Sequence, residues 1–186
     1  PTPVRPAPAL ITITPPSADL TVNQTQQFTA TVIDDRGNVL TGVALSWWIS
    51  GAGSMSPTGL FTSAPVTTGE VIDINVSIDG RALGHAFVQV SPPIVLIQPV
   101  GLIHAGLPTQ LAALVSFHGA AVTNVPVTWS VVPPTAGSVS PGGLFTGRAA
   151  GLSACVIAIA GVPPPGNPSC SGPITGGGFI AFVIQP

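Results

Sequence analysis

The chain contains short runs in which apolar and polar residues alternate one by one. Between Gln27 and Ile33, the apolar residues Phe28, Ala30 and Val32 alternate with glutamine and threonine. Between Val71 and Ile78, isoleucine and valine alternate with aspartate, asparagine and serine. Successive side chains of a β-strand point to opposite faces, so this pattern predicts strands with one buried and one solvated face. Further strands are predicted at Leu10–Thr14, Val43–Ile49 and Leu83–Val90.

Several runs in the second half of the chain are apolar at nearly every position instead. They are Leu111–Val115, Val156–Ala160 and Phe179–Ile184. A strand that is apolar on both faces is usually covered on both faces, whereas a sheet in a two-layer sandwich leaves its outer face to solvent. We therefore expect another chain to cover the outer faces of this half, with Phe179 and Phe182 among the contact residues.

One sequence block occurs twice. Val43-Ala-Leu-Ser-Trp47 precedes Gly53-Ser-Met-Ser-Pro-Thr-Gly-Leu-Phe-Thr62, and Val125-Pro-Val-Thr-Trp129 precedes Gly137-Ser-Val-Ser-Pro-Gly-Gly-Leu-Phe-Thr146. Eight of the ten positions in the longer block are identical, and the copies lie 82 to 84 residues apart. This period is too long for a solenoid unit and suits a small β-sandwich.

The repeat predicts an all-β chain of two tandem β-sandwich domains, each with about seven short strands. We expect domain 1 at residues 10–90 and domain 2 at residues 94–186, joined by a short stiff linker at 91–93. A Pro-rich arm, residues 1–9, precedes them as a flexible leader or as an extended segment that docks on a neighbour. Residues 162–178 are a Pro- and Gly-rich insertion in the second domain.

Charge is scarce and unevenly distributed. Charged residues make up 5 % of the 186 residues and the net charge is −2, too little to attract nucleic acid or an anionic membrane. Arg148 is the only charged residue after Ile94. Because soluble domains normally cover their surface with charge, we expect domain 2 to be an assembly domain with Arg148 at its contacts, and domain 1 to face solvent. No run of 18 apolar residues occurs, so no membrane-spanning helix is expected.

The two cysteines, Cys155 and Cys170, both lie in the second half. An even pair at short spacing in a chain of this composition favours a disulfide formed in an oxidising compartment, and the alternative is two separate buried thiols. Such a bridge would tie the insertion to the preceding strand.

Four features resemble the bacterial immunoglobulin-like (Ig-like) domains of group 2 and their relatives. They are an opening I-x-I-x-P strand, a Q-x-F-x-A strand (Gln26–Ala30) followed by Asp-x-x-Gly-Asn, inward Trp47 and Trp129, and the Gly-Ser-x-Ser-x-x-Gly-Leu-Phe-Thr block. The resemblance covers about residues 10–90 and 94–185, although the second repeat lacks the Asp-x-x-Gly-Asn turn and adds the insertion. It implies two Ig-like β-sandwiches, common in bacterial and archaeal surface proteins, adhesins and phage virion proteins, which are spacers, binders and polymer subunits far more often than catalysts.

Residues with catalytic or metal-binding chemistry are few and dispersed. The histidines are His85, His104 and His118. None has a cysteine or carboxylate at ligand spacing, and a zinc site needs three or four ligands. Asp34, Asp35 and Asn38 could bind Ca²⁺ through oxygen atoms, but the same residues suit a strand-connecting turn, which we favour. Domain 2 has no acidic residue and no nucleophile-elbow motif, so we expect no enzyme, no metal and no cofactor.

The aromatic residues divide by their position in the alternation. Trp47 and Trp129 occupy equivalent inward positions, where core packing is favoured over a ligand platform. Trp48 points opposite to Trp47, and Phe87 has the same outward position on the closing strand. We therefore expect Trp48 and Phe87 to be contact residues.

Two N-glycosylation patterns lie in the first domain, at Asn23-Gln-Thr25 and Asn75-Val-Ser77. Glycans at Asn23 or Asn75 would help to solubilise a surface with so little charge.

These features predict a structural subunit of an extracellular assembly, such as a filament, sheath or appendage, at a cell or virion surface. Its partners would be copies of itself or a larger scaffold, contacted through the second domain. The alternative is an adhesin or virion-surface module that recognises glycan or a host protein through Trp48 and nearby loops.

Overall fold

The computed structural model describes residues 8–66, 68–78, 80–98, 100–161, 169–171, 174 and 176–186, with backbone alone at residues 9 and 81–83. Most of the predicted arm and of the predicted insertion therefore lies outside the described residues. In the described part every regular element is a β-strand, which confirms the predicted all-β class, and this part contains no helix long and apolar enough to cross a membrane. The chain divides into two compact units, unit 1 (Pro1–Ser91) and unit 2 (Pro92–Pro186).

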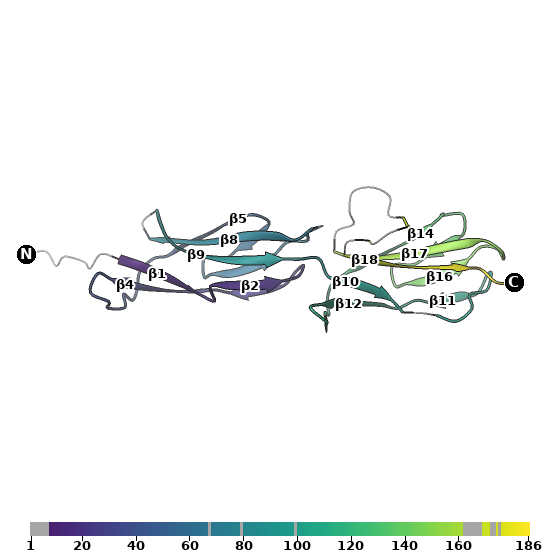
Figure 1. Ribbon diagram of the computed structural model, residues 1–186, viewed down its shortest axis with the longest axis horizontal. Helices are drawn as coiled ribbons and strands as arrows, with labels where there is room; N and C mark the ends of the chain where they lie inside the picture. The colour runs from purple at the N-terminus through teal and green to yellow at the C-terminus, as the bar shows by residue number, and fades with distance from the viewer. Residues whose placement is uncertain are drawn as a thin grey trace, which may run out of the picture. The chain divides into compact units, whose positions relative to one another are not determined.

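Unit 1 is a two-layer sandwich (Figure 1). Its strands are β1 (Pro8–Thr14), β2 (Ser17–Leu20), β3 (Thr25–Gln27), β4 (Thr29–Asp34), β5 (Ser46–Ser50), β6 (Gly53–Met55), β7 (Leu60–Ser63), β8 (Glu70–Ile78) and β9 (Arg81–Val90). One layer has the order β2-β9-β8-β5, with β2 parallel to β9. The other combines the pair β1-β4 with β3-β7-β6, and β3 and β4 are separated only by Phe28. This is the arrangement of an Ig-like sandwich, in which β1 and β2 join different layers.

Unit 2 repeats the arrangement. Its strands are β10 (Ile94–Ile97), β11 (Pro108–Gln110), β12 (Ala113–Phe117), β13 (Ala120–Ala121), β14 (Val127–Val132), β15 (Gly137–Val139), β16 (Leu144–Gly147), β17 (Ser153–Ala160) and β18 (Gly177–Val183). They form sheets β10-β12-β13, β11-β16-β15 and β14-β17-β18. The counterpart of β2 is reduced to an isolated bridge between His104 and Gln185, with the Gln185 N–H donating to the Ile103 carbonyl at 2.7 Å.

The core of unit 1 follows the predicted alternation. Ile72, Ile74 and Val76 of β8 are fully buried between the layers together with Phe28 and Phe61. Burying one such side chain contributes roughly 1.5–3 kcal/mol, so the alternation of β8 alone fixes which sheet face turns inward. Predicted strand limits shift by a few residues: the predicted run at 43–49 becomes a strand only from Ser46.

The repeated block forms the same corner in both units. In unit 1 the Gly59 N–H donates to the Ser56 carbonyl at 3.1 Å, and the Gly59 carbonyl accepts from the Phe28 N–H at 2.8 Å. Gly59 has φ +85°, and a Cβ there would lie 3.2 Å from the Trp47 ring. Two residues later Phe61 enters the core. Gly59 is therefore required both by the turn and by the tryptophan packed against it.

The second copy repeats these contacts with different core neighbours. The Gly143 N–H donates to the Ser140 carbonyl at 2.9 Å, and the Leu111 N–H donates to the Gly143 carbonyl at 2.9 Å. Gly143 has φ +81° and lies against Trp129. The spacing shared by the two copies in this chain thus encodes a corner that joins the layers.

Candidate binding surfaces

The outer face of the β2-β9-β8-β5 sheet brings aromatic and polar side chains together. Strand register aligns Trp48 of β5 with Asn75 of β8 and His85 of β9. The next outward row aligns Ser50, Asp73 and Phe87. We call the set Trp48, Asp73, Asn75, His85 and Phe87 the aromatic–polar face. It joins the two outward aromatic residues predicted from the sequence with three polar residues that sequence reasoning did not connect to them.

Both aromatic side chains of this face are open to solvent. Trp48 is 39 % exposed and Phe87 is 44 % exposed. Two strand spacings of about 4.8 Å and a two-residue step of about 6.8 Å place their Cα atoms roughly 12 Å apart. The His85 ring packs edge-on against Phe87, with 5.4 Å between ring centroids. The two rings therefore flank a polar strip rather than covering one another.

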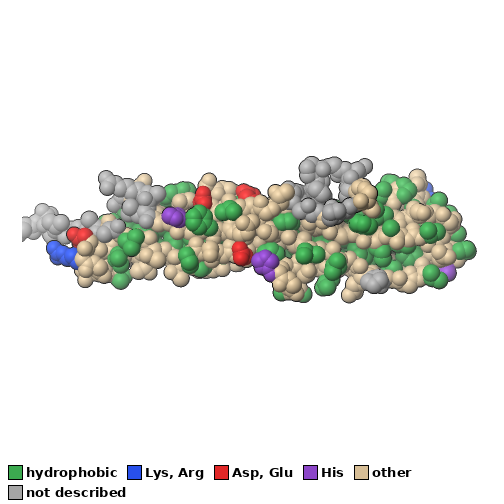
Figure 2. Space-filling view, in the orientation of Figure 1, with side chains coloured by type: hydrophobic (Ala, Val, Ile, Leu, Met, Phe, Trp, Pro, Cys, Tyr) green, Lys and Arg blue, Asp and Glu red, His purple; other side chains and the backbone are tan. Residues whose placement is uncertain are grey.

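Asp73 and Asn75 form that polar strip. They are half-buried, two residues apart on β8, and project from the same sheet face. The Asn75 Nδ2 donates to the Asp73 backbone carbonyl at 3.4 Å, so this bond does not engage the Asp73 carboxylate. Histidine, acidic and hydrophobic side chains lie beside one another over β8 and β9 in Figure 2.

The equivalent sheet face of unit 2 has the opposite character. The residues in corresponding register positions are Ser130, Ile157 and Phe179 in one row, and Val132, Cys155 and Ala181 in the next. Hence apolar residues and a cysteine occupy the positions that hold the carboxylate, amide and imidazole groups in unit 1. The two faces share their backbone pairing but differ in side-chain chemistry.

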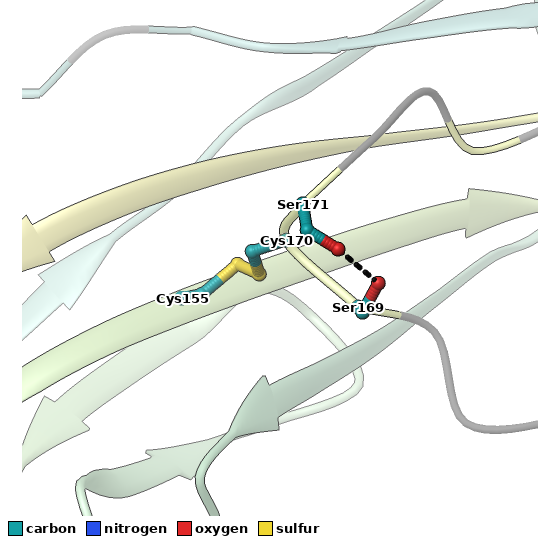
Figure 3. Close-up of a disulfide and its surroundings, with 4 residues drawn as sticks. All are labelled: Cys155, Ser169, Cys170 and Ser171. Carbon is teal, nitrogen blue, oxygen red and sulfur yellow. Dashed lines mark hydrogen bonds between the residues drawn. A yellow bond between two sulfur atoms is a disulfide. The ribbon is translucent and has the colours of Figure 1, made fainter.

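The predicted disulfide is present and lies on this face (Figure 3). Cys155 of β17 is bonded to Cys170, whose Cα is 6.4 Å away. Cys155, Ile157 and Ile159 of β17 are all buried, and Cys170 and Ile174 pack against them. Ser169 and Ser171 flank Cys170, with 2.9 Å between their hydroxyl oxygens.

For β17, this packing corrects the expectation that another chain covers the strands that are apolar on both faces. The second face of β17 is covered by Cys170 and Ile174 of the same chain. The physical reason is that the disulfide holds a segment of the chain itself against the isoleucines. An apolar run without alternation indicates that both faces of a strand are covered, but it does not indicate what covers them.

Other apolar side chains of unit 2 remain exposed. On the outer face of β10 and β12, Leu96 and Leu114 stand directly opposite each other, and Ile94 is two residues away from Leu96. On the β18 side, Phe179 and Val183 are exposed. A shallow, mainly apolar depression of about 370 Å³ lies beside the disulfide, lined by Val132, Pro133, Ser153, Ala154, Cys155, Ala181, Phe182 and Val183.

The remaining predicted contact and core residues are Arg148, Phe182, Trp47 and Trp129, and they differ in whether they face solvent or the core. Arg148 is exposed. Phe182 differs from the expectation, because its ring packs on the core side against Phe145 at a centroid distance of 5.2 Å. Strand residues three apart lie on opposite faces, so Phe179 and Phe182 could not both point outward. Trp47 and Trp129 are half-buried and pack against the cores of their units.

The Asp34–Asn38 segment is a turn held by a buried carboxylate. Asp34 Oδ1 accepts from the Arg36 N–H at 2.9 Å and from the Asn38 N–H at 2.8 Å, and Oδ2 accepts from Asn38 Nδ2 at 3.0 Å. The hydrogen bond from the Asn38 side chain, followed by those from the backbone, holds the pKa of Asp34 below its ordinary value, against the opposing effect of burial. Both oxygens are thus engaged in the turn, which favours the turn interpretation over a Ca²⁺ site.

The histidines occupy separate environments. His85 belongs to the aromatic–polar face, His118 stacks on Phe117 with 4.1 Å between centroids, and the His104 Nδ1 lies 2.6 Å from the Pro186 carbonyl oxygen. Across residues 8–161 and 169–186, apart from the undescribed positions among them, no three His, Cys, Asp or Glu side chains come together as a metal site would require.

The two glycosylation patterns differ in accessibility. Asn23 is exposed in a turn with φ +59°, and Thr25 beside it is also exposed. Asn75 lies in the middle of a sheet, and the hydroxyl-bearing Ser77 of its pattern is buried. The folded chain therefore presents the Asn23 pattern and not the Asn75 pattern.

No protein-family model and no curated protein matches the chain. Similar solved structures include domains 4 and 5 of the S-layer protein SbsC, at 16 % identity over 96 % of this chain and 98 % of that chain, with a TM-score of 0.39. The adhesin InvE of Yersinia pseudotuberculosis is 15 % identical over 94 % of this chain and 58 % of that chain, with a TM-score of 0.40. Three N-terminal domains of the bacteriophage RB49 outer capsid protein Hoc are 16 % identical over 81 % of this chain and 62 % of that chain, with a TM-score of 0.32. The chain spans 27 % of the six-domain SbsC structure.

Proposed function

We propose that this chain is part of a non-catalytic, surface-displayed structural protein that associates with copies of itself through unit 2. The observation that carries the proposal is the apolar outer surface of a unit with a single charged residue. Leu96 is 58 % exposed and directly faces exposed Leu114 across the β10–β12 pair. Arg148 supplies the only charge in this part of the sequence.

A second copy is the partner that fits this surface best. Two identical faces that lack charge bring no like-charge repulsion when they meet, and self-association through one patch is the usual route to symmetric oligomers. Covering a few hundred Å² of apolar surface is worth on the order of 10 kcal/mol at about 25 cal/mol per Å², before the costs of association are subtracted.

The disulfide supports the proposed extracellular setting. Cys155 and Cys170 are bonded across a buried sheet face, and structural disulfides of this kind form and persist in oxidising compartments. The same bond keeps the isoleucines of β17 covered without a partner. We therefore expect the contacts between copies to involve the β10–β12 face and the exposed residues of β18.

Light scattering coupled to size-exclusion chromatography tests this proposal. The wild-type chain should form oligomers or polymers as its concentration rises, and the double variant Leu96→Asp/Leu114→Asp should remain monomeric. Val39→Asp is the matched control, since Val39 in unit 1 is 61 % exposed and its substitution should leave assembly unchanged. A wild-type monomer at high concentration, or equal effects of both sets of variants, would refute self-association through unit 2.

The aromatic–polar face favours a second candidate function, a binding module of an adhesin or virion surface. Exposed Trp48 and Phe87 are the residue types that dominate binding energy at recognition surfaces. This candidate predicts saturable ligand binding by the full chain that is lost in Trp48→Ala and unaffected by Leu96→Asp/Leu114→Asp.

A further inference from the structure

We propose that the aromatic–polar face of unit 1 binds a neutral carbohydrate chain. The proposal rests on the second candidate function and names its site and ligand class. The site comprises Trp48 and Phe87 as stacking surfaces, with Asp73, Asn75 and His85 as hydrogen-bonding groups between and beside them.

The hydrogen-bonding inventory of the face suits a ligand with many hydroxyl groups. The Asp73 carboxylate only accepts, whereas the Asn75 amide and the His85 imidazole each offer a donor and an acceptor. A sugar hydroxyl also donates and accepts, so neighbouring hydroxyls satisfy such a mixed set. A cation would instead require several acceptors converging on one point, and the named face has one carboxylate.

The aromatic residues supply the apolar part of the recognition. One side of a sugar ring presents C–H groups, which pack on the face of an aromatic ring much as other apolar groups do. Trp48 and Phe87 are separated by roughly 12 Å across the sheet, farther than a single sugar ring extends. The face therefore fits an oligosaccharide or polysaccharide that contacts both rings while its hydroxyls meet Asp73 and Asn75.

The second unit shows what this sheet face looks like without such a role. There, Ile157 and Cys155 occupy the positions of Asn75 and Asp73, and the same chain covers them through Cys170. Unit 1 carries no counterpart of that cover on the described residues of the face, and Trp48 and Phe87 stay exposed. The face thus presents two exposed aromatic rings beside the half-buried Asp73 and Asn75.

Isothermal titration calorimetry of the full chain with cello-, chito-, manno- and maltohexaose tests the proposal. At least one hexasaccharide should bind. Trp48→Ala should weaken that binding about ten-fold or more, as for a residue at the centre of a recognition surface, and Asp73→Asn should weaken it severalfold. Trp48→Phe should retain part of the affinity, because it keeps an aromatic ring at the same place.

Phe179→Ala is the matched control, because Phe179 holds the register position of His85 in unit 2 and is 39 % exposed, like Trp48. It should leave the affinity within about two-fold of wild type. Equal losses in Trp48→Ala and Phe179→Ala would show non-specific adsorption and overturn the proposal. So would the absence of binding to all four hexasaccharides at millimolar concentration.

The outcome is separable from that of the proposed functions. Leu96→Asp/Leu114→Asp should abolish assembly and keep carbohydrate binding, so loss of both activities in that variant contradicts separate sites. If Trp48→Ala abolishes binding to a protein ligand while no hexasaccharide binds, the carbohydrate assignment is wrong and the binding-module function stands.

Discussion

Replacing Gly143 by alanine should destabilise unit 2 well beyond the same replacement at Gly151, a glycine with a similar left-handed backbone. Gly143 has φ +81°, and an added Cβ would lie 2.8 Å from the Leu111 carbonyl oxygen and 3.0 Å from the Trp129 ring. Gly151 has nearly the same backbone, at φ +79°, and a Cβ added there would meet no atom within 4 Å. The pair therefore separates backbone cost from packing cost.

The expected magnitudes follow from that geometry. A non-glycine residue in the left-handed region costs about 1–2 kcal/mol, which sets the expected effect of Gly151→Ala. Overpacking against a fixed carbonyl and an indole ring adds roughly 1–3 kcal/mol, so Gly143→Ala should cost about 2–5 kcal/mol in total. Gly59→Ala and Gly37→Ala, at φ +85° and +83°, form the same comparison in unit 1.

Urea unfolding followed by circular dichroism measures these differences, provided that the midpoint shifts while the slope with denaturant stays constant. If Gly143→Ala and Gly151→Ala lose equal free energy of unfolding, the tryptophan contact does not constrain the corner. The repeated glycine would then reflect the turn alone.

Three further changes have defined outcomes. Replacing Cys155 and Cys170 by alanine should lower the free energy of unfolding of unit 2 by about 3 kcal/mol, the chain-entropy value for a closed loop of some 15 residues. It should also increase the binding of a hydrophobic dye. Unchanged urea midpoints would contradict this prediction. The pKa of Asp34 is lowered in the folded chain. The contribution of its ionised carboxylate to stability is therefore complete above the unfolded-state pKa of about 3.9, and it is lost as the pH falls through the folded-state pKa. Asp34→Asn should therefore show a weaker loss of stability than wild type in acid below that pH, and parallel urea-midpoint curves would argue against it. When the chain is expressed in a glycosylating host, mass spectrometry should detect a glycan that is lost in Asn23→Gln and kept in Asn75→Gln. A glycan at Asn75 of the folded protein would contradict the accessibility argument.

The sequence predicted the features that depend on alternation. The parity of Trp48 and Phe87 places both on the outer face of their sheet, and the structure has them there. The repeated block predicts two similar units because its glycine and phenylalanine, Gly59 and Phe61 in one copy and Gly143 and Phe145 in the other, form the same corner. Phe182 was misassigned because an uninterrupted apolar run hides which parity faces the core.

Pairing between strands was the part that alternation could not supply. Asp73 and His85 meet Trp48 and Phe87 only through the register of β5, β8 and β9, and register depends on contacts between distant segments. Similarly, the isoleucines of β17 indicate a covered face, but the covering segment is set by the position of Cys170 within a stretch that has no counterpart in the first repeat.

The parallel pairing of β2 with β9 gives unit 1 a particular response to mechanical force. β2 lies near the N-terminal end of the unit and β9 at its C-terminal end, and their residues pair from Ser17↔Phe87 to Leu20↔Val90. Tension that reaches both strands pulls these parallel neighbours in opposite directions along their axes, so their hydrogen bonds bear the load together instead of opening one after another. Forced unfolding is governed by the height of the unfolding barrier, and a sheared pair raises that barrier. In unit 2 the corresponding connection is one bridge at Gln185, so the two halves of the chain should yield at different forces when it is stretched between its ends.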